Sequence, residues 1–218
     1  MHNPLTETLD RILHTDLAII QKKKGYRFTC DSTYLAHFVE VPKDANILEL
    51  GSGSGIISLL LATKHTGVHI TGIELQKTYH DLALRNIQMN NLEKVVEFIQ
   101  RDFRTLKLRR EFDIVVANPP YRKWKSGRIN PLEEKALARH EITATLDDVV
   151  KAAKRFLKNK GAFYIIYNVE RMVDLISTLR AYALEPKKIK LILHKHEAIF
   201  VLVKAIYNGN PGCKIYLE

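Results

Sequence analysis

The fold of this chain is decided by one stretch, Asn46-Ile47-Leu48-Glu49-Leu50-Gly51-Ser52-Gly53-Ser54-Gly55. Its first half is apolar enough for a buried strand, and its second half carries glycine at every other position. Glycine permits a sharp turn and lets a ligand approach the backbone where a Cβ atom would collide. An apolar segment of helical length follows, as far as Lys64. A strand, a glycine turn and a helix in this order are typical of a ligand-binding turn at the carboxyl edge of a doubly wound sheet.

This turn belongs to a longer series of alternating strands and helices. The expected strands cover residues 46–50, 68–74, 95–100, 112–117 and 162–167, the expected helices residues 55–64, 77–91, 146–157 and 169–182, and a closing antiparallel pair residues 189–193 and 199–206. Such alternation predicts an α/β fold with a Rossmann-like, doubly wound, mostly parallel sheet of seven strands. A long polar and basic stretch, residues 122–145, interrupts the series and is typical of a binding loop.

The N-terminal segment has a different pattern. Its first apolar residues recur at helical spacing, which predicts a short amphipathic helix over Leu5–Thr15. An apolar run over residues 17–21 and an alternating segment over residues 26–28 predict the two strands of a hairpin.

A second helix is expected before Pro42, and either Asp31 or Ser32 is expected to cap its N-terminus. Residues 1–42 therefore form, in this prediction, a helix and hairpin extension. The alternating strands and helices of residues 43–218 form the main domain, and the extension is expected to cover its ligand site.

Several features of the sequence narrow down the ligand of the glycine turn. A dinucleotide fingerprint needs glycine at the position of Ile56, and a P-loop needs a Gly-Lys-Ser/Thr sequence that does not follow. Glu74 ends the second strand, where a carboxylate can accept hydrogen bonds from both hydroxyls of a ribose. Asp102 follows the third strand and can accept a hydrogen bond from an adenine amino group, with Phe103 beside the ring. Since the turn contains no arginine or lysine, these residues favour an adenosyl ligand without phosphate.

The fourth strand ends in the motif Asn118-Pro119-Pro120-Tyr121. The two prolines stiffen the backbone and remove two amide donors, which leaves the side-chain oxygen of Asn118 and the carbonyl of Pro119 as acceptors. Acceptors for both hydrogens of an exocyclic amine localise its lone pair and stabilise the charge of a transition state. Stacking on Tyr121 contributes about 1–3 kcal/mol per base, against an unstacking cost of a few kcal/mol. The motif therefore predicts group transfer to an amino nitrogen.

The chain carries a formal net charge of +10, and part of this charge flanks the Asn-Pro-Pro-Tyr motif. The charge alone is explained equally well by solvated surfaces and by a surface that binds a polyanion. The basic residues directly after the motif favour nucleic acid, whose phosphates supply most of the non-specific affinity. The residues expected to contact it are Arg104, Lys107, Arg109, Arg110, Arg122, Lys123, Lys125 and Arg128.

Other patterns argue against several classes of protein. Cys30 and Cys213 have neither the spacing of a zinc site nor that of a disulfide framework. The N-terminus lacks a signal pattern, and the apolar stretch Ile56–Ala62 is too short to span a bilayer. We therefore expect a cytoplasmic protein without a metal ion and without a membrane partner.

In their order and spacing, these residues resemble the class I S-adenosylmethionine-dependent methyltransferases, and specifically the branch that methylates amino groups. The chain is similar to the bacterial tRNA1(Val) adenine-37 N6-methyltransferase family. The resemblance is carried by Gln21-Lys22-Lys23-Lys24-Gly25-Tyr26-Arg27-Phe28, by the motif at residues 118–121 with its basic loop and Ala138-Arg139-His140-Glu141, and by the closing pair of strands. It implies that residues 43–218 are a class I methyltransferase domain. The implied reaction is methyl transfer to N6 of adenine in RNA, with adenine 37 of tRNA1(Val) as the expected target.

The resemblance also implies roles for individual residues. S-adenosylmethionine is expected to be bound by Glu49, Gly51, Ser52, Gly53, Gly55, Glu74, Leu75, Asp102, Phe103, Asn118 and Asp31. The target base is expected to be held by the catalytic residues Asn118, Pro119, Pro120 and Tyr121. A role in the site and a purely structural role are equally compatible with Arg139 and His140, and Trp124 is either a further stacking face or part of a core or lid.

Two other acceptors share the logic of this motif. Glutamine N5-methyltransferases act on release factors, and guanine-N2 methyltransferases act on ribosomal RNA. The chain shows neither the helical N-terminal domain expected of the former nor the duplicated domain of the latter, which favours adenine. A non-catalytic module that binds cofactor or RNA is a third interpretation, and the intact motif argues against it.

Overall fold

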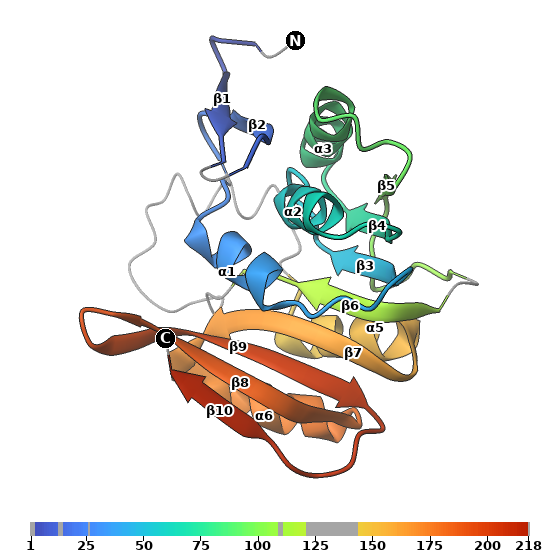
Figure 1. Ribbon diagram of the computed structural model, residues 1–218, viewed down its shortest axis with the longest axis vertical. Coiled ribbons are helices and arrows are strands. Elements are labelled where there is room, and N and C mark those ends of the chain that lie inside the picture. The colour runs from blue at the N-terminus through green and yellow to red at the C-terminus, as the bar shows by residue number, and fades with distance from the viewer. Residues whose placement is uncertain (1–2, 13–14, 26, 109–110, 121–143, 218) are drawn as a thin grey trace.

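A computed structural model describes residues 3–12, 15–25, 27–108, 111–120 and 144–217. The main sheet of this part of the chain has eight strands in the order β10-β8-β9-β7-β6-β3-β4-β5 (Figure 1). They are β3 (Asn46–Leu50), β4 (His69–Glu74), β5 (Val96–Gln100), β6 (Phe112–Ala117), β7 (Leu157–Asn168), β8 (Leu184–His194), β9 (Glu197–Tyr207) and β10 (Lys214–Leu217). β9 runs antiparallel to β7 and β8, and the other neighbouring pairs are parallel. The predicted α/β fold with a mostly parallel sheet is confirmed.

The sheet has one strand more than the seven predicted. β10 pairs in parallel with β8, from Lys214 beside Lys188 to Leu217 beside Leu191. All four side chains of β10 are exposed. The strand therefore lacks the alternation of buried and exposed residues by which a strand is recognised in a sequence. Its extended conformation is evident only from its pairing with β8.

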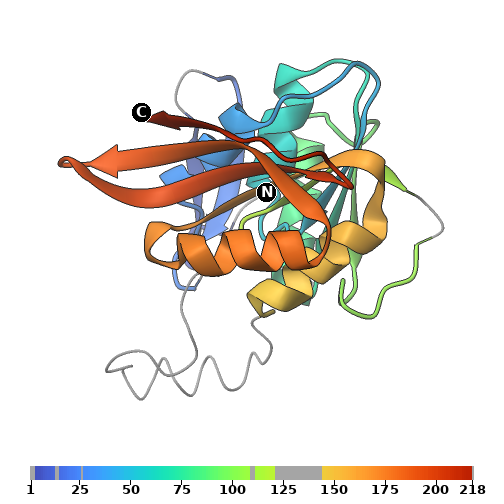
Figure 2. The same ribbon diagram turned by 90° about the horizontal axis from the view of Figure 1, so that it is seen from below.

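Helices cover both faces of the sheet (Figures 1 and 2). One face carries α1 (Cys30–Phe38), α2 (Ile56–Lys64) and α3 (Lys77–Met89), and the other carries α5 (Leu146–Phe156) and α6 (Met172–Ala181), which the short 3-10 helix η1 (Val169–Arg171) precedes. Because β3 is covered on both faces, its neighbours Ile47 and Leu48 point into opposite layers and are both fully buried. Among the described residues, none of the helices has the length and apolar character needed to cross a membrane.

The parallel strands end level with one another. Leu50, at the end of β3, lies beside Ile73 of β4 and Ala117 of β6, and Glu74 lies beside Gln100 of β5. Ligands of open α/β sheets bind outside this carboxyl edge. The glycine turn after β3 and the polar residues that end or follow β4, β5 and β6 therefore meet at one edge of the molecule.

The prediction of a helix over Leu5–Thr15 is wrong. Residues Glu7–Arg11 form a strand, β1, which pairs antiparallel with β2 (Ala18–Lys22) in a separate two-stranded sheet. Leu5 and Leu9, which were expected on the apolar face of the helix, are 86% and 47% exposed. Since these side chains meet no core, their helical spacing has no energetic consequence, and backbone pairing with β2 determines the conformation.

Two further expectations for the N-terminal segment are wrong. Residues 26–28 were expected to form the second strand of the hairpin, but β2 pairs with β1, and residues 27 and 28 lead directly to α1. The N-cap of α1 is Thr29, and the predicted caps Asp31 and Ser32 lie within the first turn. Both of these side chains are buried, which means that they face the protein interior.

Two asparagine side chains of α3 dock the hairpin onto the main domain. Asn86 accepts a hydrogen bond from the Ile20 amide at 2.7 Å and donates to the Ile20 carbonyl at 3.1 Å, and Asn90 pairs in the same way with Ala18 at 3.1 and 2.8 Å. Asn86 and Asn90 are four residues apart in a helix, which is a rise of about 6 Å, and Ala18 and Ile20 are two residues apart in a strand, which is a rise of about 6.8 Å. Because these two distances match, each asparagine lies opposite its partner on β2. Asn86 also donates to the carbonyl of Ser54 at 2.9 Å, and it thereby connects the hairpin to the glycine turn.

Candidate functional site

The backbone conformation explains the glycines after β3. The φ angles of Gly51, Gly53 and Gly55 are 71°, 55° and 86°, in the left-handed region that favours glycine. The amides of Gly51 and Ser52 donate to the carbonyl of Ile73 at 2.9 and 3.0 Å. These bonds hold the turn against the end of β4.

The glycines serve two different purposes. A Cβ atom at Gly51 would meet no atom within 4 Å, so open space lies beside this residue. A Cβ atom at Gly55 would lie 2.7 Å from Cζ of Phe98, and one at Gly72 of β4 would collide with the same ring. Gly51 therefore leaves space beside the turn, whereas Gly55 and Gly72 are required for the packing around Phe98.

Two buried carboxylates lie next to the turn. Glu74 is 7% exposed, and its two oxygens accept hydrogen bonds from the amides of Gly53 at 2.9 Å and Gln76 at 2.8 Å. Glu49 is 2% exposed, and its Oε2 accepts from the amide of Ser58 at 3.1 Å and from the hydroxyl of Ser58 at 2.5 Å. Both carboxylates are thus oriented by neutral donors.

Burial raises the pKa of Glu49, the hydrogen bonds from Ser58 lower it, and the nearby charge of Glu74 raises it; together these effects place the pKa at about 8. Neither carboxylate forms an ion pair with another residue of the described chain. A ligand that brings positive charge to this edge would stabilise the ionised form of Glu49.

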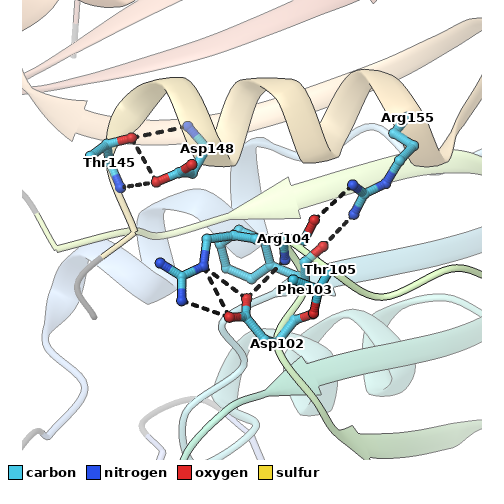
Figure 3. Close-up of polar contacts among 7 residues, drawn as sticks. All are labelled: Asp102, Phe103, Arg104, Thr105, Thr145, Asp148 and Arg155. Carbon is cyan, nitrogen blue, oxygen red and sulfur yellow. Dashed lines mark hydrogen bonds and ion pairs between the residues drawn. The ribbon is translucent and has the colours of Figure 1, made fainter. Parts of the chain in front are cut away.

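Asp102 and Phe103 follow β5, in a turn that the amide of Arg101 ties to the carbonyl of Glu74 at 3.1 Å. The carboxylate of Asp102 forms an ion pair with Arg104 (Figure 3). Nη2 of Arg104 donates to Oδ2 at 2.6 Å, and Nε donates to Oδ1 and Oδ2 at 2.9 and 3.0 Å. This hydrogen-bonded guanidinium lowers the pKa of Asp102, which holds it ionised.

Asn118 follows β6 and points toward the first turn of α1. Its Nδ2 donates to Oδ2 of Asp31 at 3.1 Å and to the hydroxyl of Ser32 at 3.0 Å. Since Nδ2 is the donor in both bonds, the nitrogen of the carboxamide faces α1 and its oxygen faces away. Asp31 is in turn held by the hydroxyl of Thr29 at 2.5 Å and the amide of Ser32 at 2.8 Å.

The structure brings the predicted cofactor residues to the carboxyl edge of four neighbouring strands. Glu49, Gly51, Ser52, Gly53 and Gly55 lie at or after the end of β3, Glu74 and Leu75 at the end of β4, Asp102 and Phe103 after β5, and Asn118, Pro119 and Pro120 after β6, with Asp31 in the facing turn of α1. Of the basic residues predicted to contact nucleic acid, Lys107 is exposed and Arg104 is paired with Asp102. Tyr121, Trp124, Arg139 and His140 lie outside the described residues, as do Arg109, Arg110, Arg122, Lys123, Lys125 and Arg128.

Four residues that organise this edge were not identified from the sequence. They are Ser32, Ser58, Asn86 and Arg155, which hydrogen-bond to Asn118, Glu49, the Ser54 carbonyl and the turn after β5. Ser58 carried a usable signal, because it is a polar residue within the apolar helix α2. The other three contact partners far away in the sequence, and no local pattern marks such contacts.

Three observations fit an adenosyl ligand at this edge. The hydroxyl of Ser52 is buried and has no hydrogen-bond partner among the described residues, and space is open beside Gly51. Leu75, directly after Glu74, is 39% exposed although it is apolar, so it offers a face to a planar ring.

Known proteins with similar sequences are methyltransferases. The methyltransferase small domain family matches residues 27–183. A protein of Flavobacteriaceae bacterium strain 3519-10, named tRNA1(Val) (adenine(37)-N6)-methyltransferase, is 25% identical over 212 residues, which cover 91% of this chain and 89% of the relative. A relative of the same name from Aliivibrio salmonicida is 26% identical over 67% of this chain, and this match spans 62% of the relative's own length.

Solved structures with the same fold include several methyltransferases. A structure described as a predicted O-methyltransferase from Agrobacterium tumefaciens superposes with a TM-score of 0.68 at 18% identity, over 86% of this chain and 85% of the other. A structure described as a class I S-adenosylmethionine-dependent methyltransferase from Listeria monocytogenes superposes with a TM-score of 0.64 at 13% identity, over 85% of this chain and 62% of the other. The family match at residues 27–183 covers most of the chain. The chain therefore belongs to the methyltransferase small domain family and is an S-adenosylmethionine-dependent methyltransferase.

Proposed function

We propose that the enzyme transfers a methyl group to the exocyclic N6 amino group of adenine in RNA, and that adenine 37 of tRNA1(Val) is its target. The orientation of Asn118 is the observation that carries this proposal. Its carboxamide is fixed at the carboxyl edge, with the acceptor oxygen turned away from α1. The names of the relatives support the same acceptor.

The lone pair of adenine N6 is delocalised into the ring, which makes this nitrogen a weak nucleophile. With its own nitrogen held by Asp31 and Ser32, Asn118 can offer only its carbonyl oxygen to an incoming amine. The carbonyl of Pro119 is a second acceptor next to it. Acceptors for both amine hydrogens localise the lone pair and stabilise the positive charge that develops on nitrogen in the transition state.

When bound, S-adenosylmethionine supplies a methyl group whose bond to sulfur breaks as the bond to nitrogen forms; the electron pair stays on sulfur, and the nitrogen then loses a proton to solvent. The enzyme's residues hold both reactants in position, which lowers the entropic part of the barrier. We assign Glu74 to the ribose hydroxyls and Asp102 to the adenine amino group of the cofactor. The open space beside Gly51 allows the cofactor to approach the backbone.

The charge of the chain supports RNA as the substrate. A formal net charge of +10 favours a polyanion over a neutral peptide. Lys107 is exposed and can contact a phosphate, and four of the predicted basic contacts directly follow the Asn-Pro-Pro-Tyr motif in the sequence. A tRNA substrate implies a cytoplasmic enzyme.

Nucleoside mass spectrometry identifies the acceptor. Total tRNA is incubated with the enzyme and labelled S-adenosylmethionine and is then digested to nucleosides, and we expect the label in N6-methyladenosine. Ribosomal RNA and a release-factor peptide are assayed in parallel. Label in N2-methylguanosine or in methylglutamine, with none in N6-methyladenosine, would overturn the proposal in favour of the guanine or the glutamine acceptor.

Substitution of Asn118 tests its role as the acceptor group. We expect Asn118→Ala to lower kcat about 100- to 1000-fold, the cost of removing one preorganised group at a developing charge. The KM for S-adenosylmethionine should change much less. Asn159→Ala is the matched control, because Asn159 is exposed near the start of β7, at the opposite edge of the sheet. A kcat of Asn118→Ala within tenfold of the wild type would show that the assignment is wrong.

A further inference from the structure

Arg104 was predicted from its position in the sequence to contact RNA, but the structure directs it to Asp102 (Figure 3). We infer that Arg104 and Arg155 are positioning residues for the adenine of the cofactor. Arg104 orients the carboxylate of Asp102, and Arg155 holds the turn that carries Asp102 and Phe103. This inference rests on the proposed assignment of Asp102 to the adenine amino group.

The hydrogen bonds of Arg104 determine how Asp102 can bind a further group. The backbone amide of Arg104 donates to Oδ1 at 2.9 Å, Nε donates to both oxygens, and Nη2 donates to Oδ2 at 2.6 Å. A carboxylate has about four acceptor positions, and these bonds occupy the side that faces Arg104. Because Nε shares its single hydrogen between the two oxygens, three N–H groups of Arg104 occupy about three of these positions. About one position remains for a donor from another direction, which suits the amino group of adenine.

The surroundings of Arg104 also argue against a phosphate as its partner. The carboxylates of Asp102 and Asp148 both raise the pKa of Arg104, and Asp102, its hydrogen-bond partner, has the larger effect. Its side chain is 26% exposed. A phosphate bound to Arg104 would bring a further negative charge close to Asp102 and Asp148, whereas the exposed Lys107 can bind one without an ion pair to either of them.

Arg155 connects the turn after β5 to the helix layer that α5 and α6 form. From the last turn of α5, its Nη1 donates to the carbonyl of Arg104 at 2.9 Å and its Nη2 donates to the carbonyl of Phe103 (Figure 3). A single planar guanidinium thereby fixes two successive peptide groups.

The helix that carries Arg155 is itself fixed at both ends. At its start, the hydroxyl of Thr145 accepts a hydrogen bond from the amide of Asp148 at 3.1 Å, and the carboxylate of Asp148 accepts from the amide of Thr145 at 2.9 Å. Near its end, Phe156 is buried in the core. The position of the adenine acceptor thus depends on α5 through Arg155.

A pair of ligands isolates this effect. S-adenosylhomocysteine carries the 6-amino group, and S-inosylhomocysteine carries oxygen in its place, which Asp102 would repel. Calorimetry of the wild-type enzyme should show a preference of about 10- to 100-fold for the amino ligand, the usual worth of a hydrogen bond to a charged group. In Arg104→Met and in Arg155→Met we expect this preference to fall about tenfold.

Controls separate positioning from other effects. Lys151→Met, one helical turn before Arg155, and Arg101→Met, beside Asp102, replace exposed cations and should keep the wild-type preference. Arg104→Lys keeps the charge but loses the planar fork, so it should give an intermediate preference. A general loss of stability would weaken both ligands equally and leave their ratio unchanged.

The possible outcomes distinguish this inference from the assignment on which it rests. If the wild type itself does not distinguish the two ligands, the assignment of Asp102 to adenine is wrong. If the wild type distinguishes them and Arg104→Met and Arg155→Met do so equally well, the positioning role is wrong. A slope of log Kd for tRNA against log salt that falls by about 0.9 in Arg104→Met would instead show a phosphate contact and overturn the inference.

Discussion

Glu49 shows how a single residue at this edge is held in an unfavourable environment. It is 2% exposed, and within the described part of the chain only the amide and hydroxyl of Ser58 compensate for the loss of water around its carboxylate. Burial therefore raises its pKa to about 8. The protonated form is favoured in the folded protein, and the ionised form is favoured in the unfolded chain at neutral pH.

The sign of this shift gives a prediction for stability. The contribution of Glu49 is fully present below its unfolded pKa of 4.5 and is lost as the pH rises through about 8. For the enzyme without ligand, we expect the free energy of unfolding to fall over this range by on the order of a few kcal/mol. The free energy of unfolding, measured with urea at several pH values in this range, should decrease much less in Glu49→Gln than in the wild type. The exposed Glu93→Gln is the control, and an unchanged pH dependence in Glu49→Gln would contradict the account.

Residues of the candidate site differ in how far the sequence predicts them. Gly51, Glu74, Asp102 and Asn118 could be located because each ends or follows a strongly apolar strand, and parallel strands must end at a common edge. Arg155 could not be predicted. It is an exposed residue on α5 that contacts backbone carbonyls, and backbone acceptors leave no pattern in the sequence.

At the scale of elements, the central strands of the main sheet were predictable because they are buried on both faces and therefore continuously apolar, whereas the exposed strand β10 was not. In the N-terminal hairpin, the apolar strand β2 was predicted over residues 17–21, but its partner β1 was not, because the pairing of β1 with β2 overrides the helical spacing of its apolar residues. Asn86 and Asn90 provide carboxamide groups that pair with the backbone of β2 as a neighbouring strand would. Asparagine in the middle of a helix is no signal for such a contact.

Substitution of the two asparagines tests this docking. Asn86 is fully buried with three hydrogen bonds to backbone groups, so Asn86→Ala should lower the free energy of unfolding by about 2–4 kcal/mol. Asn90 is partly exposed, so Asn90→Ala should lower the free energy of unfolding by a smaller amount. Because only Asn86 reaches the Ser54 carbonyl, Asn86→Ala alone should also weaken S-adenosylhomocysteine binding. Equal effects of both variants on ligand affinity would argue against the link to the glycine turn.

At the scale of the whole molecule, most of the proposed cofactor residues lie at or after the ends of β3, β4 and β5, and the proposed acceptor residues follow β6. The N-terminal segment reaches the acceptor side through α1, where Asp31 and Ser32 orient Asn118. The hairpin, the glycine turn and the acceptor motif are thus parts of one connected structure. The net charge of +10 then favours RNA as the molecule that binds across this edge.

The central claim is that the enzyme methylates N6 of adenine 37, and methyl transfer to two transcripts tests it most directly. One transcript has the sequence of tRNA1(Val), and the other carries guanine instead of adenine at position 37. We expect one methyl group on the first, found as N6-methyladenosine at position 37, and almost none on the second, because guanine has an oxygen where adenine has the amino group. Equal methylation of both transcripts, or a methyl group at another position, would contradict the account.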